Sequence, residues 1–104
     1  MLQFHKDILA EFKKAGKNTE VILFGSVAKG RYRLDSDIDI AIISDDKKVR
    51  ERSSKIADKI LVKYGKVVSV KFFTKNEFYE RMKRKDPFVV EVSQGKVIYS
   101  GRKN

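Results

Sequence analysis

The chain has 104 residues, of which 41% are hydrophobic, and its 24 Lys and Arg residues against 14 Asp and Glu give a formal net charge of +10. This length and composition predict a single domain over residues 1–104 and exclude disordered, fibrous and membrane-spanning proteins, because the longest apolar runs are far below the roughly 20 residues that cross a bilayer. The absence of Cys excludes disulfide scaffolds, thiolate metal sites and cysteine nucleophiles, and it fits a cytoplasmic location. The positive charge favours anionic partners such as nucleotides, nucleic acid or acidic protein surfaces.

A first helix is predicted over residues 2–15, because apolar residues recur there at helical spacing and Gly16 follows as a stop. The apolar face of this helix is formed by Ile8, Leu9 and Phe12. His5, the sole histidine, is expected on the surface rather than as a ligand or a base.

A short strand and a turn come next. Residues 21–24 form a continuous apolar run, which is typical of a strand buried on both faces. The run ends at Gly25, where the chain must turn, and Ser26 is expected to cap a short helical stretch through Lys29. Gly30 then ends that stretch.

A second strand is predicted over residues 37–43, after a polar loop over residues 31–36. Asp and Ile alternate at its start, so Asp37 and Asp39 share one face, about 6–7 Å apart along the strand. The isoleucines at positions 38, 40 and 42 turn to the opposite face, toward the packed interior.

The rest of the chain alternates helices and strands: a helix over about 49–64 stopped by Gly65, a strand over 67–73, a helix opened by a capping box of Thr74 and Glu77, a short helix opened by Asp86 and Pro87 and stopped by Gly95, and an edge strand over 97–99. This order predicts an α/β (mixed α+β) fold, with helices packed against a small mixed sheet.

The Gly-Ser turn has the chemistry of a phosphate site. Backbone N–H groups point out of a helix N-terminus, Gly25 lets a phosphate approach the backbone, and the Ser26 hydroxyl can donate to it. Lys29 and Arg31 can add positive charge, and Ser36 completes the predicted nucleotide-binding set.

The Asp-x-Asp pair has the chemistry of a metal site. Two ionised carboxylates at this spacing repel each other unless a cation lies between them. Asp37 and Asp39 are therefore predicted to bind one or two Mg²⁺ (or Mn²⁺) ions and to act as the catalytic residues of phosphoryl or nucleotidyl transfer. Taken alone, Gly-Ser is common turn chemistry and Asp-x-Asp is a weak signal; it is their joint occurrence at this spacing that favours the site.

Phe24-Gly25-Ser26, followed after ten residues by Asp37-Ile38-Asp39-Ile40, resembles the signature of the DNA polymerase beta-like nucleotidyltransferase superfamily. The segments LFGSVAKG and DSDIDIAII and the C-terminal segment PFVVEVSQGKVIYSG are similar to the corresponding sequences of the minimal nucleotidyltransferases of archaea and bacteria. The resemblance implies the nucleotidyltransferase fold, with the Gly-Ser turn on the phosphates and the Asp pair on the metals. It also implies Mg²⁺-dependent transfer of a nucleoside monophosphate, with AMP from ATP expected, to a hydroxyl group. Minimal domains of this kind often act as antitoxins beside a helical HEPN-type partner, and some adenylylate a tyrosine of that partner.

One strand departs from the family pattern. Active relatives usually carry a third carboxylate beside the Asp-x-Asp strand, whereas strand parity places Ser69 at that position with Lys71 on the same face. Ser is a poor Mg²⁺ ligand and cannot act as a carboxylate base, and Lys71 can hold phosphate but opposes a second metal.

Two functions stay open. One is a Mg²⁺-dependent nucleotidyltransferase acting on a protein or a small molecule. The other is a weak or inactive nucleotide-binding antitoxin that neutralises a HEPN-type partner by binding it. Nucleic-acid binding through the Lys and Arg clusters is a minority hypothesis, and a homo-oligomer, in which a second subunit supplies the missing carboxylate, also stays open.

Overall fold

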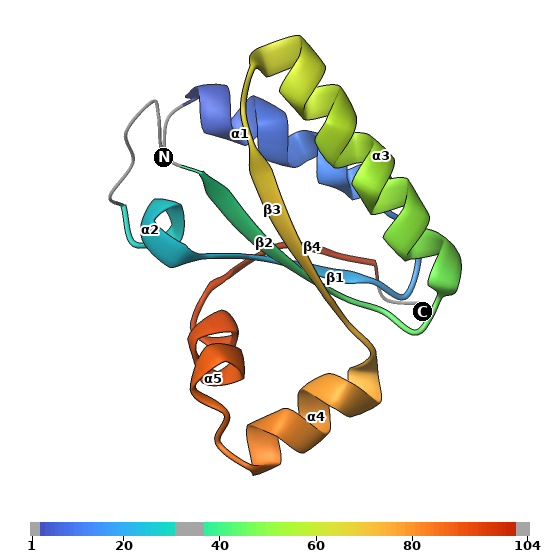
Figure 1. Cartoon of the computed structure of the whole chain (residues 1–104), viewed down its shortest axis with the longest axis vertical. Helices are drawn as coiled ribbons and strands as arrows, with labels where there is room; N and C mark the ends of the chain where they lie inside the picture. Colours follow the sequence, from blue (N-terminus) through green and yellow to red (C-terminus); the bar gives the residue numbers. More distant parts are fainter. Residues whose placement is uncertain (1–2, 31–36, 102–104) are drawn as a thin grey trace.

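A four-stranded sheet forms the centre of the computed structural model, which describes residues 3–30 and 37–101 (Figure 1). The strands are β1 (Glu20–Phe24), β2 (Ile38–Ile43), β3 (Val68–Phe73) and β4 (Lys96–Ser100), and their spatial order is β3-β2-β1-β4. β1 runs antiparallel to β2 and β4, whereas β2 and β3 are parallel. The predicted mixed sheet is confirmed, and so is the edge position of the last strand.

Helices cover the sheet from both sides (Figure 1). α1 (Gln3–Ala10), which continues into the short 3₁₀ helix η1 (Glu11–Lys14), lies with α3 (Lys47–Tyr64) on one side, and α4 (Lys75–Lys83) and α5 (Pro87–Ser93) lie on the other. The four-residue helix α2 (Gly25–Ala28) follows β1 directly. Within residues 3–30 and 37–101, no helix is long and apolar enough to cross a membrane.

Local signals fix where the helices begin and end. The Thr74 hydroxyl accepts from the Glu77 backbone N–H at 3.0 Å, and the Glu77 side chain returns a bond to the Thr74 N–H, so the predicted capping box opens α4. The Asp86 carboxylate opens α5 by accepting from the Phe88 N–H at 2.9 Å. Gly65 ends α3 with φ at 66°, a left-handed conformation that glycine adopts without strain. These three predictions from the sequence are confirmed.

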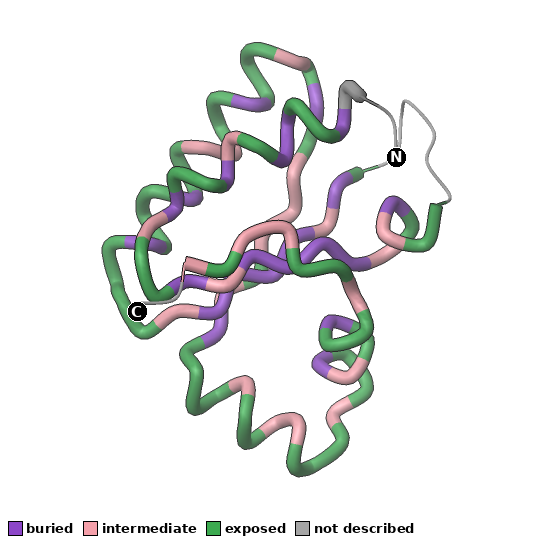
Figure 2. The backbone as a smooth tube through the Cα atoms, turned by 180° about the vertical axis from the view of Figure 1, so that it is seen from behind, coloured by how far each residue is buried: buried purple, intermediate pink, exposed green. Residues whose placement is uncertain are grey.

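Two apolar cores lie on opposite faces of the sheet, and the central strands β1 and β2 are its most deeply buried strands (Figure 2). The larger core lies under α1 and α3 and includes Ile8, Phe12, Val21, Leu23, Ile38, Ile40, Ile42, Val49 and Ile60. The smaller core lies against α5 and consists of Ile22, Phe24, Ala41, Ile43, Phe73, Val89 and Val92. The alternation along β2 thus turns its even-numbered isoleucines toward the larger core, as predicted.

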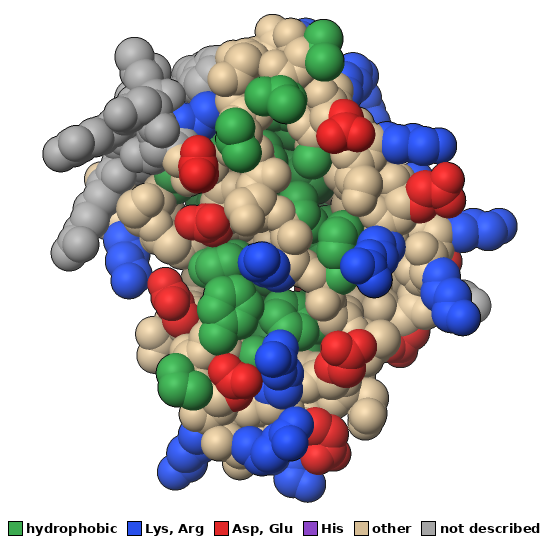
Figure 3. All heavy atoms as spheres, in the orientation of Figure 1, with side chains coloured by type: hydrophobic (Ala, Val, Ile, Leu, Met, Phe, Trp, Pro, Cys, Tyr) green, Lys and Arg blue, Asp and Glu red, His purple; other side chains and the backbone are tan. Residues whose placement is uncertain are grey.

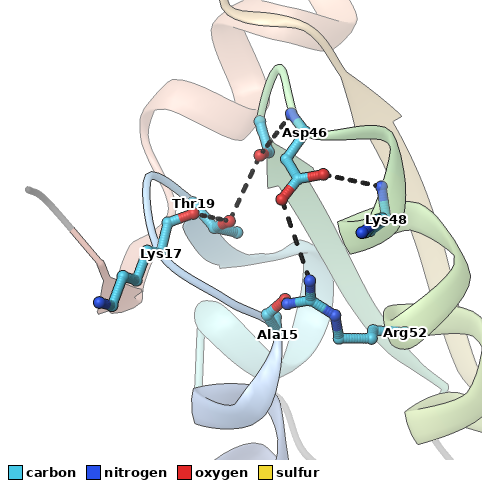
Figure 4. A network of polar contacts seen from close by, with 7 residues as sticks. Ala15, Lys17, Thr19, Asp46, Lys48 and Arg52 are labelled. Atoms are coloured by element: carbon cyan, nitrogen blue, oxygen red, sulfur yellow. Dashed lines mark hydrogen bonds and ion pairs between the residues drawn. The ribbon is translucent and has the colours of Figure 1, made fainter.

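A polar network ties the loop before β1 to the start of α3 (Figure 4). The Arg52 guanidinium donates to the Ala15 carbonyl at 2.9 Å and lies 3.9 Å from the Asp46 carboxylate. The Thr19 hydroxyl donates to the Lys17 carbonyl at 3.0 Å. Because β1 enters the sheet here, the network helps to set its register at the end far from Gly25.

The predicted surface position of His5 is wrong: its side chain is fully buried. Positions 5, 8, 9 and 12 share one helical face, so His5 enters the same interior as Ile8 and Phe12. Burial lowers the pKa of His5 from its ordinary value, because the charged imidazolium loses its hydration, and the nearby Lys66 ammonium lowers it further.

The predicted cap of the second helix is also wrong. Phe24 is the residue that precedes α2, and no side chain caps the helix. Gly25 and Ser26 instead form its first turn, because the chain leaves β1 in an extended conformation that ends only at Phe24. The Ser26 hydroxyl is therefore exposed beside the end of the strand instead of being used within the helix.

Candidate active site

The end of β1 and the start of β2 bring the two halves of the sequence motif together. Phe24 pairs with Asp39 across the antiparallel β1–β2 ladder, and Asp39 pairs with Ser69 across the parallel β2–β3 ladder. Gly25 follows Phe24 and Asp37 precedes β2, so both lie at the same end of the sheet. The three strand-paired residues Phe24, Asp39 and Ser69 thus lie side by side across the sheet and position the site.

Gly25 is required at its position for two reasons. Its φ is 78°, a region that residues with a side chain rarely adopt. In addition, a Cβ atom built on Gly25 would lie 2.5 Å from Oδ2 of Asp39, which is closer than atoms can pack. The glycine therefore lets the turn and the carboxylate lie in direct contact.

Asp39 is half-buried, whereas Asp37 is exposed. Burial raises the pKa of Asp39 above its ordinary value of 3.8, and the negative charges of Asp37 and Glu91 raise it further. The positive charge of Lys71 acts in the opposite direction. A cation bound between the aspartates would relieve the same repulsion.

The carboxylate pair fits Mg²⁺ by its donor chemistry, since Mg²⁺ takes oxygen ligands and is commonly held by one or two carboxylates together with substrate phosphates and water. Among the described residues, no group of three or more His, Asp or Glu side chains is arranged to hold a metal. Asp37 and Asp39 would thus leave most coordination positions to the nucleotide. The described residues therefore do not form a metal site that is complete without a bound nucleotide.

The α2 helix brings two of the predicted nucleotide-binding residues to the site. Ser26 and Lys29 are both exposed, Ser26 in the first turn and Lys29 at the C-terminal cap. Because α2 has only four residues, its predicted contribution to anion binding would come from the local N–H groups of its first turn rather than from a long macrodipole. Arg31 and Ser36 lie outside the described residues.

Ser69 lies where the strand parity predicted. It is half-buried, pairs with Asp39 and shares its face of the sheet, and Lys71 lies two residues further along on the same face. The face seen in Figure 3 carries acidic and basic side chains interspersed around an apolar patch. Next to Asp39, β3 therefore supplies a hydroxyl and an ammonium group and no carboxylate.

Glu91 of α5 is the residue near the site that the sequence analysis missed. Its carboxylate lies 3.9 Å from the Lys29 ammonium, and its charge acts on Asp39. The aromatic ring of Phe88, three residues earlier, packs edge-on against Phe24 with centroids 5.5 Å apart. No local sequence signal reveals this proximity, because it depends on where α5 crosses the sheet.

A cavity of about 620 Å³ lies away from the motif, at the opposite end of the β1–β2 pair. It is lined by Asn18, Thr19, Glu20, Ile43, Lys75, Phe78, Tyr79 and Met82. None of the residues at the motif contributes to it. At the motif itself, Ser26, Lys29 and Asp37 are exposed.

Comparison with known proteins agrees with this geometry. The sequence model of the nucleotidyltransferase domain family matches residues 5–98, which include every residue discussed at the site. The chain belongs to this family. The family is the one that the Gly-Ser and Asp-x-Asp motifs indicated, and the polymerase beta-like resemblance is confirmed with it.

Two relatives from Methanocaldococcus jannaschii carry the name protein adenylyltransferase. One is 40% identical over 57 residues, which span 55% of this chain and 55% of the relative. The other is 36% identical over 72 residues, 61% of this chain and 73% of the relative. The chain thus spans about half the length of the first and about three quarters of the second.

A solved structure described as a toxin-antitoxin with AMP-PNP has the same fold, with a TM-score of 0.60 over 95% of this chain and 74% of that chain. The two sequences are 20% identical over the alignment, so the likeness concerns the fold. It confirms the predicted nucleotidyltransferase architecture.

Proposed function

We propose that this nucleotidyltransferase domain transfers AMP from Mg²⁺-bound ATP to a hydroxyl group of a protein, and that the acceptor protein is a helical HEPN-type partner. The observation that carries the proposal is the close approach of the Asp39 carboxylate to the Gly25 turn, where a Cβ atom on Gly25 would lie 2.5 Å from Oδ2 of Asp39. A phosphate-binding turn and a metal-binding carboxylate that touch each other are suited to a metal-bound triphosphate.

The roles of the side chains follow from their positions. Asp37 and Asp39 would hold Mg²⁺, which when bound neutralises phosphate charge and orients the reacting phosphate. The N–H groups of the Gly25–Ser26 turn and the Ser26 hydroxyl would donate to phosphate oxygens, and Lys29 would add a mobile positive charge. Lys71, from the neighbouring strand, faces the same side as Asp39 and favours an anionic ligand there.

Two findings favour adenylylation of a protein over other transfers. The relatives named protein adenylyltransferase support both AMP and a protein acceptor, and the toxin-antitoxin neighbour with AMP-PNP supports an adenine nucleotide and a protein partner. The site is also open, with Asp37, Ser26 and Lys29 exposed, so a side chain of another protein can reach it.

A second candidate function rests on Ser69. Because the residue opposite Asp39 is a serine, the neighbouring strand offers no carboxylate to the metal or to the incoming hydroxyl. This favours an antitoxin that binds nucleotide and neutralises its partner by contact with little or no turnover.

Label transfer separates the two functions. ATP labelled at the α-phosphorus is incubated with Mg²⁺ or Mn²⁺, the chain and the co-expressed HEPN-type protein, beside an Asp39→Asn variant. Label that enters the partner with the wild type and not with Asp39→Asn supports the transferase. If the chain binds Mg²⁺-ATP and captures the partner but transfers no label, the result would instead support the antitoxin that acts by binding.

A further inference from the structure

Glu91 lies on the side of α5 that faces the candidate active site. Phe88 packs against Phe24, the last residue before the Gly-Ser turn, and Glu91 follows Phe88 by three residues, so both project from the same side of the helix. From this side the Glu91 carboxylate reaches Lys29 at 3.9 Å. Val89 and Val92 meanwhile face the sheet and are fully buried, which anchors α5 in this orientation.

Nucleotidyl transfer requires a proton acceptor. As the acceptor oxygen forms a bond to the α-phosphorus, the bond from that phosphorus to the pyrophosphate oxygen breaks, and the hydroxyl proton must leave. Carboxylates that hold a divalent cation are poor bases, which removes Asp37 and Asp39 from this role. The Ser69 hydroxyl is a weak base, and a lysine ammonium such as that of Lys71 has no lone pair to accept a proton. The strand β3 therefore supplies no general base either.

We propose that Glu91 is the general base of the reaction and accepts the proton of the acceptor hydroxyl. This assignment rests on the proposed transferase function. Glu91 is a carboxylate outside the Asp pair that lies 3.9 Å from the Lys29 ammonium, and the helix that carries it packs through Phe88 against Phe24, the strand partner of Asp39. It comes from a helix instead of from the strand beside Asp39. A base supplied by α5 makes turnover compatible with serine at position 69.

The ion pair with Lys29 links the base to nucleotide binding. Both side chains are about half exposed, 60% for Lys29 and 45% for Glu91, so water screens the pair and it is weak. A triphosphate carries several negative charges and attracts the Lys29 ammonium more strongly. Binding of ATP therefore draws Lys29 to the phosphates and leaves the Glu91 carboxylate available for the acceptor hydroxyl.

The test compares Glu91→Gln with Glu80→Gln, a matched change at an exposed residue of α4. Label transfer from α-labelled ATP to the co-expressed HEPN-type protein should fall by about 10²–10⁴-fold in kcat for Glu91→Gln and stay unchanged for Glu80→Gln. The affinity for a non-hydrolysable ATP analogue with Mn²⁺ should stay within about threefold of the wild type in both, since the base acts after binding. Glu91→Ala supplemented with formate should regain part of the lost rate, which a purely structural role would not allow.

The outcomes separate the two proposals. A wild type that transfers label while Glu91→Gln transfers it equally well overturns the role of Glu91 and leaves the transferase intact. A Glu91→Gln variant that loses the nucleotide analogue in proportion to its rate, without rescue by formate, overturns it as well, in favour of a role in binding. A wild type that binds Mn²⁺ and the analogue but transfers no label overturns the transferase, and the base assignment with it.

Discussion

The two faces of the sheet are built differently. The face under α1 and α3 is closed by aliphatic side chains from both helices and the strands, most of them fully buried. The face toward α4 and α5 has a smaller core in which the rings of Phe24, Phe73 and Phe88 meet, and α4 contributes no fully buried residue (Figure 2). Asp39, Ser69 and Lys71 belong to this second face.

The difference separates stability from chemistry. The face covered by two helices holds the strands in register, because a slip in register would bury polar side chains there without their hydration. The other face is covered over β1 by α5 and stays partly open over the start of β2 and β3, where a carboxylate can remain hydrated and reach a ligand. We expect substitutions on the first face to change folding and those on the second to change binding.

The largest effect on stability is expected at Ile40, which is fully buried under α3. Ile40→Ala should lower the free energy of unfolding by about 2–5 kcal/mol, because it removes buried methyl groups and leaves a cavity. Met82→Ala, in the half-buried layer of the other face, should cost about 1 kcal/mol. Urea denaturation followed by circular dichroism measures both, and equal losses would contradict the proposed contrast between the faces.

A smaller effect on stability, with a clear effect on binding, is expected at Gly25. Gly25→Ala and its control Gly30→Ala both place a side chain at φ 78°, and each should lose about 1–2 kcal/mol of stability. Among the described residues, a Cβ at Gly30 meets no atom within 4 Å, whereas one at Gly25 meets the Asp39 carboxylate. Only Gly25→Ala should therefore weaken binding of Mn²⁺ with a non-hydrolysable ATP analogue, by about 10–100-fold. Isothermal titration calorimetry distinguishes the pair, and equal affinities would show that the contact with Asp39 is dispensable.

The sequence predicts most of the fold because its local signals are strong. The capping box at Thr74, the glycine after Tyr64 and the Asp-Ile alternation each fix an element by themselves. Residue type alone places His5 on the surface, whereas the helical spacing of positions 5, 8, 9 and 12 places it in the interior, where the structure has it. The 3.6-residue period was the better guide to burial.

The candidate site was predictable only where it follows from strand parity. Ser69 opposite Asp39 is a consequence of two neighbouring strands and their period of two, and the structure places it so. Glu91 was not predictable, since its approach to Lys29 depends on the crossing of α5 over β1 and on the packing of Phe88 against Phe24. Such contacts between elements distant in sequence leave no local pattern.

A pH effect is expected from the closed face, at His5. The pKa of His5 is lowered by burial, so the unfolded chain binds its proton more readily than the folded protein below the ordinary value of 6.5. Stability should therefore fall as the pH drops below 6.5, by at most about 1.4 kcal/mol per pH unit from this residue. Urea midpoints between pH 7 and 5 should decline less for His5→Gln than for the wild type. Parallel declines would assign the effect to other groups.

The smallest effect on the free energy of unfolding is expected at Asp39. Its substitution should stabilise the protein, whereas Ile40→Ala destabilises it. The pKa of Asp39 is raised by burial and by neighbouring carboxylates, so between 3.8 and the raised value the folded protein binds more protons than the unfolded chain, and stability falls as the pH rises. Asp39→Asn should then be more stable than the wild type at pH 7, and the difference should vanish at pH 3, where both side chains are uncharged.

Addition of Mn²⁺ with the ATP analogue should reverse the order at pH 7, because a ligand stabilises only a protein that binds it, and Asp39→Asn lacks a metal-binding carboxylate. A variant less stable than the wild type at pH 7 without ligand would mean that Asp39 supports the fold. If it is more stable without ligand and less stable with it, Asp39 is retained at the expense of stability, as expected of a residue on the open face that serves binding.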